Sequence, residues 1–383
     1  MRICLVYDCL FPYTIGGAER WYRELAARLV EEGHEVTYLT LRQWPRGEHP
    51  GVPGVRVQVV GPRMELYTGD GRRRILPPLE FGIGVLAHLI RHGGRYDVVH
   101  TASFPYFSVL AAAVARPLRG FRLVVDWHEV WSREYWREYL GRAGAIGFGV
   151  QRLCARAPQR AFCFSRLHGE RLEAAGLRGK PTVLPGEYDG PLDRPDPEPA
   201  EPVVVFAGRH IPEKRVGSLV EAMAVLRKRV PELRCEIFGD GPERPRVEAL
   251  VRTRGLEDAV SVRGFVDAGE LARALRRSLC MVLPSRREGY GQVVVEASAA
   301  GVPSVVCVAP DNAATELVED GANGVLAPSA EPEALADAIE RVWRAGPGLR
   351  VSTADWFEAN ARRLSLGSSL ETVARAYTAG DGG

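Results

Sequence analysis

Two basic side chains in the second half of the chain stand where a phosphate-bearing ligand could be held. The segment VVVFAG, residues 203–208, predicts a strand, and Arg209 and Lys214 follow it in the loop GRHIPEK, five residues apart. A guanidinium and an ammonium at this spacing could bind a diphosphate from two directions. The alternative is a solvated loop that carries charges, and these two residues alone leave both interpretations open.

Two acidic side chains lie in the stretch LPSRREGYGQVVVEASAAGVPSVV, residues 283–306. Seven residues separate Glu288 from Glu296, so one carboxylate would precede a helix that begins near residue 291 and the other would lie one turn inside it. Carboxylates so placed could accept hydrogen bonds from sugar hydroxyls beside an anion at the helix start. The intervening residues would supply close backbone approach and unpaired N–H groups, at Gly289, Gly291, Gln292 and Val293. The segment VVVEA also suits a strand by propensity, so the helix is an open prediction.

Glycines follow predicted strands at two further places. Gly16 and Gly17 stand at a predicted helix start, where backbone N–H groups favour an anion, although a flexible turn is an equal alternative. Gly239 and Gly241 flank a sharp turn from strand to helix, which is better evidence for fold than for function. No GxGxxG follows the first strand, and no acid ends the second, so a nicotinamide enzyme is disfavoured.

The elements that must position these residues alternate between strands and helices, which predicts parallel sheets with right-handed crossovers. In the first half we expect strands at Ile3–Tyr7, Glu35–Leu41, Arg56–Val60, Asp97–His100, Arg122–Trp127, Ala161–Ser165 and Thr182–Leu184. The pattern restarts after a proline-rich stretch, with strands at 203–208, 234–239, 259–264 and 279–283. The fold class is therefore α/β, with two Rossmann-like, doubly wound domains that face each other across a cleft.

The predicted domain boundaries follow the linker GPLDRPDPEPAEP, residues 190–202, which holds five prolines and four acids. Residues 1–189 would form the first domain and residues 203–352 the second. Helical residues 353–383 would cross back to complete the first domain.

Composition limits the classes of protein that fit. The 383 residues, 46% hydrophobic and 26% charged, suit two or three globular domains. No apolar run is long enough for a membrane-spanning helix, and the first residues do not resemble a secretory signal, so a cytoplasmic location is expected. The seven cysteines show no CxxC spacing and suit small core positions. Residues 1–190 carry 26 Lys and Arg against 19 Asp and Glu, and the remainder 24 against 29.

The order and spacing of these motifs resemble the family 4 retaining glycosyltransferases of the GT-B fold. The resemblance rests on Gly16-Gly17, GRHIPEK, GDGP, EGYGQVVVE and the closing VEDGANGVL, and it covers nearly the whole chain. It implies transfer of a sugar from a nucleoside diphosphate sugar to an acceptor hydroxyl, with no cofactor and no bound metal.

The resemblance also implies residue roles. Arg209 and Lys214 would neutralise the donor diphosphate, which the Gly16-Gly17 loop would approach from the other domain. Glu288 would lie beside the donor sugar and Glu296 would bind the ribose. Gly289, Gly291, Gln292 and Val293 would contact sugar and phosphate through the backbone, and Gly239 and Phe265 would surround the base. His128, after the strand-like LVVDW, would lie near the reacting centre, although a structural loop histidine is the alternative.

Three departures from the family leave the donor sugar and acceptor open. LPGEYD stands where many members have Asn-Gly, PDNAATE at 310–316 replaces a common Gly-Gly, and WHEVWSREYWREYLG is unusually aromatic. The acceptor could be a glycan, a lipid-linked molecule or a small molecule, and no nucleic-acid partner is expected. Arg72-Arg73-Arg74 before an apolar stretch could contact anionic lipid at the inner face of a membrane, but a solvated loop before a core helix is favoured. A nucleotide-sugar 2-epimerase or a non-catalytic sugar-nucleotide-binding protein are the alternative functions.

Overall fold

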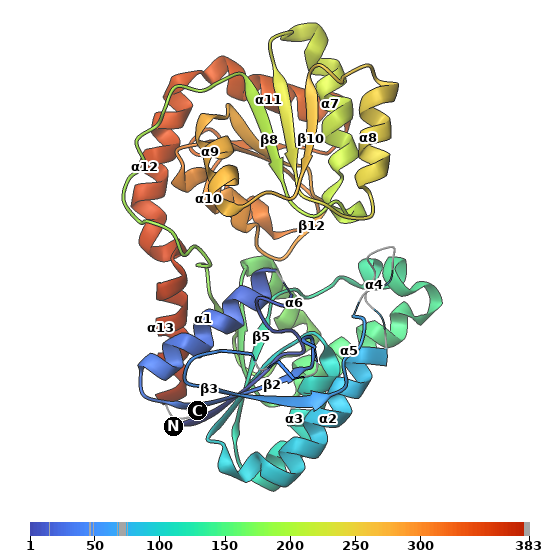
Figure 1. Cartoon of the computed structure of the whole chain (residues 1–383), viewed down its shortest axis with the longest axis vertical. Helices are drawn as coiled ribbons and strands as arrows, with labels where there is room; N and C mark the ends of the chain where they lie inside the picture. The colour runs from blue at the N-terminus through green and yellow to red at the C-terminus, as the bar shows by residue number, and fades with distance from the viewer. Residues whose placement is uncertain are drawn as a thin grey trace. The chain divides into compact units, whose positions relative to one another are not determined.

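A computed structural model describes residues 1–14, 16–45, 47–48, 50–66, 68, 74 and 76–378. Contacts between Cα atoms divide these residues into two compact units (Figure 1). Unit 1 comprises residues 1–68, 74–185 and 369–378, and unit 2 comprises residues 186–368. Both are α/β units built on a parallel sheet, as the alternating sequence pattern predicts.

Unit 1 contains a seven-stranded parallel sheet in the order β3-β2-β1-β4-β5-β6-β7. Its strands are β1 (Arg2–Val6), β2 (Glu35–Leu41), β3 (Val55–Gly61), β4 (Val98–Ala102), β5 (Arg122–Trp127), β6 (Arg160–Cys163) and β7 (Thr182–Val183). Its helices are α1 (Gly17–Glu31), α2 (Leu76–His92), α3 (Tyr106–Arg119), α4 (Arg133–Leu140), α5 (Gly144–Arg156) and α6 (Arg166–Ala175), with short 3-10 turns η1 (Gly93–Arg95) and η2 (Gly141–Ala143).

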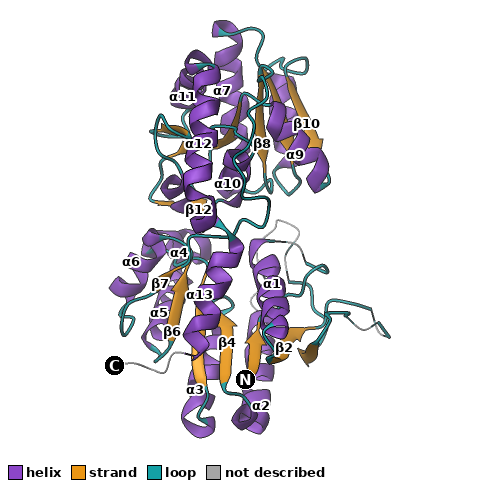
Figure 2. Cartoon of the chain, turned by 90° about the vertical axis from the view of Figure 1, so that its left-hand side faces the viewer, coloured by secondary structure: helices purple, strands orange, loops and turns teal. Residues whose placement is uncertain are grey.

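Helices cover both faces of this sheet. Helix α1 and the C-terminal α13 (Leu366–Thr378) lie over one face, and α2, α3 and α5 lie over the other (Figure 2). Helix α1 buries Trp21, Tyr22, Leu25 and Leu29, which recur at helical spacing. Strand β4 is buried along its whole length, as expected for a strand covered on both faces.

Unit 2 contains a six-stranded parallel sheet in the order β10-β9-β8-β11-β13-β15. Its strands are β8 (Val203–Ala207), β9 (Arg234–Phe238), β10 (Val260–Gly264), β11 (Cys280–Leu283), β13 (Ser304–Cys307) and β15 (Gly324–Ala327), and a separate short pair joins β12 (Arg287–Glu288) to β14 (Asp311–Asn312). Its helices are α7 (Val216–Arg229), α8 (Arg244–Thr253), α9 (Ala268–Arg277), α10 (Gln292–Ala299), α11 (Pro332–Ala345) and α12 (Pro347–Leu364), with 3-10 turns η3 (Pro212–Lys214) and η4 (Ala313–Leu317).

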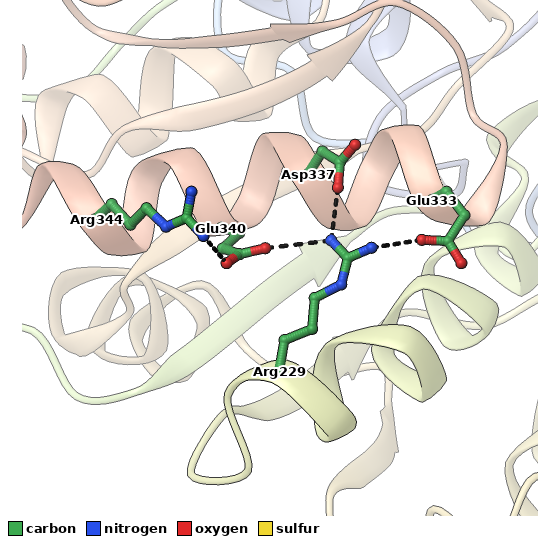
Figure 3. Close-up of polar contacts among 5 residues, drawn as sticks. All are labelled: Arg229, Glu333, Asp337, Glu340 and Arg344. Carbon is green, nitrogen blue, oxygen red and sulfur yellow. Dashed lines mark hydrogen bonds and ion pairs between the residues drawn. The ribbon is translucent and has the colours of Figure 1, made fainter.

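An ion-pair network ties two helices of unit 2 together on one side of the sheet. Arg229, the last residue of α7, contacts three acids of α11, and Figure 3 shows its guanidinium among them. The distances are 2.6 Å to Glu333, 2.6 Å to Asp337 and 3.2 Å to Glu340. Because one guanidinium serves acids spaced along one helix face, it fixes how the two helices align.

The proline-rich stretch forms neither helix nor strand and runs along unit 2. Tyr188 N–H donates to the Leu364 carbonyl at 3.0 Å, and Leu366 N–H donates to Tyr188 at 2.7 Å. Arg194 pairs with Asp355 at 2.8 Å. These contacts join the two segments to each other, and Arg350 of α12 donates to the carbonyls of Ser278 and Arg276 in unit 2. Residues 186–189 and 353–368 accordingly lie with unit 2 in the contact division, whereas the sequence pattern assigned them to the first domain.

Candidate functional site

The loops after the strands of unit 2 carry the residues that the sequence analysis singled out for a nucleotide-sugar donor. Arg209 and Lys214 follow β8, Gly239 follows β9 and Phe265 follows β10. The residues after β11 are Glu288, Gly289, Gly291, Gln292, Val293 and Glu296. Because the strands are parallel, all of these loops leave the same edge of the sheet, where ligands of α/β sheets bind.

Lys214 and Glu288 contact each other directly. The Lys214 ammonium donates to a Glu288 carboxylate oxygen at 2.5 Å, and the side chains are 21% and 10% exposed. A second pair lies alongside, because Glu213 is 3.9 Å from Arg287, and Arg286 N–H donates to the Glu213 carbonyl at 3.0 Å. Two successive residues of η3 are thus joined to two successive residues of β12. The sequence predicted both the cation and the acid but not this contact.

Backbone contacts hold the loop that carries Arg209. Gly208 N–H donates to the Phe238 carbonyl at 3.1 Å, and His210 N–H donates to the Asp240 carbonyl at 2.8 Å. Gly239 has φ 118°, and a Cβ atom there would collide with the Gly208 carbonyl. Glycine at 239 therefore lets the β8 and β9 loops pack closely, and it leaves the Arg209 side chain exposed on a fixed backbone.

The segment VVVEA is helical, which resolves the choice between helix and strand. Gly291 precedes α10 with φ 106°, and a Cβ there would lie within 2.5 Å of the Ala314 Cβ. The N–H groups of Gln292 and Val293 belong to the first turn, so no carbonyl of the same helix satisfies them. Glu296 follows inside the helix, and Glu288 precedes it. This arrangement fits an anion at the helix start with a carboxylate on each side of it.

Asn312 organises the same region and was not identified from the sequence. Its side-chain N–H₂ group donates to the Ser285 carbonyl at 3.0 Å and the Cys307 carbonyl at 2.7 Å, and its oxygen accepts from Ala314 N–H at 3.1 Å. It also faces Glu288 across the β12–β14 pair. The segment PDNAATE, a departure from the family pattern, therefore supports the loop that carries Glu288. No sequence pattern marks this role, because the burial of Asn312 and its place beside Ser285 and Cys307 depend on the tertiary structure.

Phe265 lies on the loop after β10 and is 76% exposed. An exposed aromatic ring at a strand end is available for stacking against a planar ligand. Gly264 before it has φ 76°, which turns the chain sharply out of the strand.

In unit 1, Gly16 and Gly17 stand at the start of α1. Gly16 is extended, with φ −172°, and a Cβ there would collide with the Glu19 carboxylate. Glu19 is 8% exposed and lies in the first turn, where a carboxylate favourably opposes the helix dipole. Gly16 therefore leaves room for this acid, and nothing crowds Gly17.

His128 follows β5 and stacks on Phe164, with ring centroids 4.5 Å apart and an interplanar angle of 8°. Burial lowers the pKa of His128, and the nearby charges of Asp126 and Glu129 only partly oppose this effect. Its Nε2 atom is buried without a hydrogen-bond partner among the described residues. The ring is thus held neutral in a defined orientation.

A buried polar cluster lies next to His128. Asp126 is 2.8 Å from His100 Nε2 and accepts from Trp21 Nε1 at 2.7 Å. Burial would raise the pKa of Asp126, but the charge and hydrogen bond of His100, the charge of His128 and the Trp21 hydrogen bond together outweigh it, so the carboxyl pKa lies below its usual value. Tyr377 of α13 contacts the other nitrogen of His100 through its hydroxyl group.

The aromatic stretch after His128 is largely used in packing within unit 1. Gln151 Oε1 accepts from Trp131 N–H at 3.0 Å, Trp136 Nε1 at 3.0 Å and Tyr106 Oη at 2.9 Å. Trp131 also packs against Tyr135, with ring centroids 4.8 Å apart. The high aromatic content therefore has a structural explanation.

Arg72 and Arg73 of the predicted lipid-contacting run lie outside the described residues, and Arg74 pairs with Glu65 at 2.7 Å. In the part of the chain that the structure describes, no helix has the length and apolar character needed to span a membrane. The same residues contain no group of three or more His, Cys, Asp or Glu side chains placed to hold a metal ion.

Comparison with solved structures defines the fold. A sucrose-phosphate synthase from Thermosynechococcus elongatus matches with a TM-score of 0.78 and 22% identity, over 98% of both chains. Anabaena HepE, solved with UDP and glucose, matches with a TM-score of 0.73 and 20% identity, over 99% of this chain and 100% of that one. Together with the two parallel α/β units, these matches define a GT-B fold.

Sequence comparison then gives the family. The model described as Glycosyltransferase Family 4 matches residues 15–189, and the one described as Glycosyl transferases group 1 matches residues 193–363. A D-inositol 3-phosphate glycosyltransferase of Paenarthrobacter aurescens is 30% identical over 86% of this chain and 84% of its own. An alpha-D-kanosaminyltransferase of Streptomyces kanamyceticus is 37% identical over 37% of this chain and 36% of its own. The chain belongs to the family 4 glycosyltransferases and is a glycosyltransferase enzyme.

Proposed function

We propose that this glycosyltransferase moves a sugar from a nucleoside diphosphate sugar to an acceptor hydroxyl, with retention of anomeric configuration and without a metal ion. The observation that carries the proposal is the set of loops at one sheet edge of unit 2, where Lys214 pairs with Glu288 beside the start of α10. The names of matched proteins are consistent with such a donor, because HepE was solved with UDP and glucose.

The proposed reaction breaks the bond between the anomeric carbon and the diphosphate oxygen. The bonding electrons leave with the diphosphate, the acceptor oxygen bonds to the anomeric carbon, and a phosphate oxygen takes the acceptor proton. Negative charge therefore builds on the leaving diphosphate. Lys214, Arg209 and the N–H groups of Gln292 and Val293 would stabilise that charge in the transition state.

Glu288 and Glu296 would bind the sugar parts of the donor. Glu288 would orient the transferred sugar and Glu296 the ribose, with Gly289 and Gly291 admitting the ligand close to the backbone. The Lys214 ammonium has three donors, so it can keep Glu288 in place while it binds a phosphate oxygen. Glu288 would therefore hold the Lys214 ammonium in position for the diphosphate before the donor binds.

The remaining residues have proposed roles in donor and acceptor binding. Gly239 and Phe265 would contact the base, which could stack on the exposed ring. In unit 1, the Gly16-Gly17 loop would contact the diphosphate. His128 would lie near the reacting centre. The uncharged ring of His128 would act by position and hydrogen bonding.

The test uses the Lys214→Ala variant, with Lys228→Ala as a matched control, because Lys228 is an exposed lysine of the same unit. Thermal-shift measurements with a panel of nucleoside diphosphate sugars, starting with UDP-glucose, should find a stabilising donor. Lys214→Ala should weaken that donor about tenfold to a hundredfold and lower kcat/KM about a hundredfold or more, with the fold retained.

Product analysis separates the proposal from its alternatives. With the donor found, free nucleoside diphosphate should form only when an acceptor is present, and the product's anomeric proton coupling should match that of the donor. Release of nucleoside diphosphate together with an epimerised sugar, without any acceptor, would support the epimerase instead. Equal turnover in Lys214→Ala and Lys228→Ala would overturn the assigned site.

A further inference from the structure

A polar pocket in unit 1 is lined by none of the residues assigned to the transfer reaction. It encloses about 420 Å³, within the range of small-molecule sites. Strands β1, β2 and β3 contribute residues near their amino-terminal ends, whereas Gly16 and His128 follow carboxyl-terminal strand ends. The last turns of α2 and the turn η1 also contribute residues to the pocket. Its lining residues are Arg2, Glu35, Thr37, Arg56, Gln58, His88, His92, Arg95 and Tyr96.

The lining is strongly basic. It contains three arginines and two histidines but a single carboxylate, that of Glu35. Arg2 forms an ion pair with Asp97, which lies outside the lining, at 3.4 Å. For Arg56 and Arg95, no ion pair with a carboxylate occurs among the residues that the structure describes. Two guanidinium groups that lack such an ion pair, at a pocket with a single carboxylate in its lining, leave positive charge for an anionic ligand to neutralise.

The lining also offers neutral hydrogen-bonding groups. His88 Nε2 lies 2.8 Å from the Tyr96 hydroxyl, and the His88 ring is 5.0 Å from the His92 ring between centroids. Burial, followed by the charges of His92, Arg56 and Arg95, lowers the pKa of His88 to about 4. The lining also holds the hydroxyl of Thr37 and the amide of Gln58. Polar groups of this kind can bind hydroxyls on the uncharged part of a ligand.

We propose that this pocket binds a phosphomonoester whose remaining part carries hydroxyl groups. Arg56 and Arg95 would bind the phosphate oxygens, because a guanidinium presents paired donors that match a phosphate. Gln58, Thr37 and Tyr96 would contact the hydroxyls. The ligand is either a free phosphate ester or the headgroup of a lipid, which share this chemistry.

The experiment measures binding of inorganic phosphate and glycerol 3-phosphate to the full chain by calorimetry. The Arg56→Gln/Arg95→Gln double variant is compared with Arg91→Gln, which changes an exposed arginine of α2 outside the lining. We expect the double variant to weaken glycerol 3-phosphate about tenfold or more and Arg91→Gln to leave it unchanged. Lys214→Ala should also leave it unchanged, which separates this pocket from the proposed donor site.

A second measurement, the pKa of His88 by NMR, reports on the pocket itself. An anion beside His88 favours its protonated form, so bound phosphate should raise the His88 pKa measured by NMR. The other groups that face this ring are His92, Arg56, Arg95 and Tyr96, with Arg2 and Glu35 also in the lining. No saturable binding of either probe, or equal binding by the double variant, would overturn the proposal.

Vesicles distinguish the two sources of the phosphate. Co-sedimentation with phosphatidylcholine vesicles that contain phosphatidic acid, lost in the double variant but kept in Arg91→Gln, would assign a lipid headgroup. Binding of glycerol 3-phosphate without binding to these vesicles would assign a free ester.

Discussion

Lys214 and Glu288 are 74 residues apart in sequence and joined by one hydrogen bond in the structure. The residue types and their places after strands were visible in the sequence, because loops after parallel strands gather at one edge. Their direct contact was not visible in the sequence, because it depends on how η3 and β12 approach each other. The contact between Glu213 and Arg287 was likewise not visible in the sequence, and the sequence analysis assigned neither residue to the site.

His128 carries the first prediction at the scale of a residue. Its pKa in the folded chain lies below the ordinary value of 6.5, so the unfolded chain binds the proton more readily. The stability that the neutral ring contributes is present above about pH 6.5 and is lost as the pH falls toward the lowered pKa. Urea unfolding at about pH 7.5 and about pH 5.5 should therefore show a smaller pH-dependent loss in His128→Gln than in the unmodified chain.

His88 and His210 also have lowered pKa values because of burial. They contribute equally to the pH dependence of stability in the unmodified chain and in His128→Gln. The difference between the two proteins therefore isolates His128, at up to about 1.4 kcal/mol per pH unit. An identical pH dependence in both would show that the neutral ring is not stabilised by the fold.

Helix α10 carries a prediction at the scale of an element. Gly291 has φ 106°, and its missing side chain makes room for Ala314 and Leu317. Gly291→Ala should lower the free energy of unfolding by about 1 to 3 kcal/mol, because the backbone strain and the collision act together. Thermal unfolding measures this loss. Gly348→Ala, in α12 with open space around it, is the control and should change little.

Asn312 gives a second prediction for the elements around the site. Asn312→Ala removes the donors to the carbonyls of Ser285, in the loop after β11, and Cys307, the last residue of β13. The expected loss in the free energy of unfolding is about 2 to 4 kcal/mol, because buried carbonyls lose their partners. Chemical denaturation measures it, and donor affinity should fall as well. An unchanged free energy of unfolding in Asn312→Ala would mean that water donates to these carbonyls in place of the amide.

At the scale of the whole molecule, the chain returns to unit 1 through α13. Leu370, Val373 and Tyr377 of this helix are buried, and the Tyr377 hydroxyl contacts His100 of β4, 277 residues away in sequence. The C-terminal residues are therefore part of the first-half core. Tyr377→Phe should cost about 1 to 2 kcal/mol, because His100 Nδ1 loses its partner while Nε2 keeps Asp126.

A truncation ending at Ser368 tests the same point more strongly. It removes apolar side chains that contribute about 1.5 to 3 kcal/mol each when fully buried. Amide hydrogen exchange should become faster in β4 and β5, while β8 and β9 of unit 2 retain their protection. Uniform loss of protection in both units, or none in β4, would contradict the role of α13 in unit 1.

The sequence by itself determined the local features: two parallel α/β units, most strand positions, and the segments after strands that carry Arg209, Lys214, Glu288 and Glu296. Apolar periodicity and the placement of glycine and proline report on segments of a few residues, so these features can be read without the fold. The tertiary structure alone decided that VVVEA is a helix, that Lys214 binds Glu288, that Asn312 supports β11 and β13, and that residues 353–368 lie with unit 2. Each of these depends on packing and hydrogen bonds between segments far apart in the chain, and such contacts leave no periodic trace in the sequence.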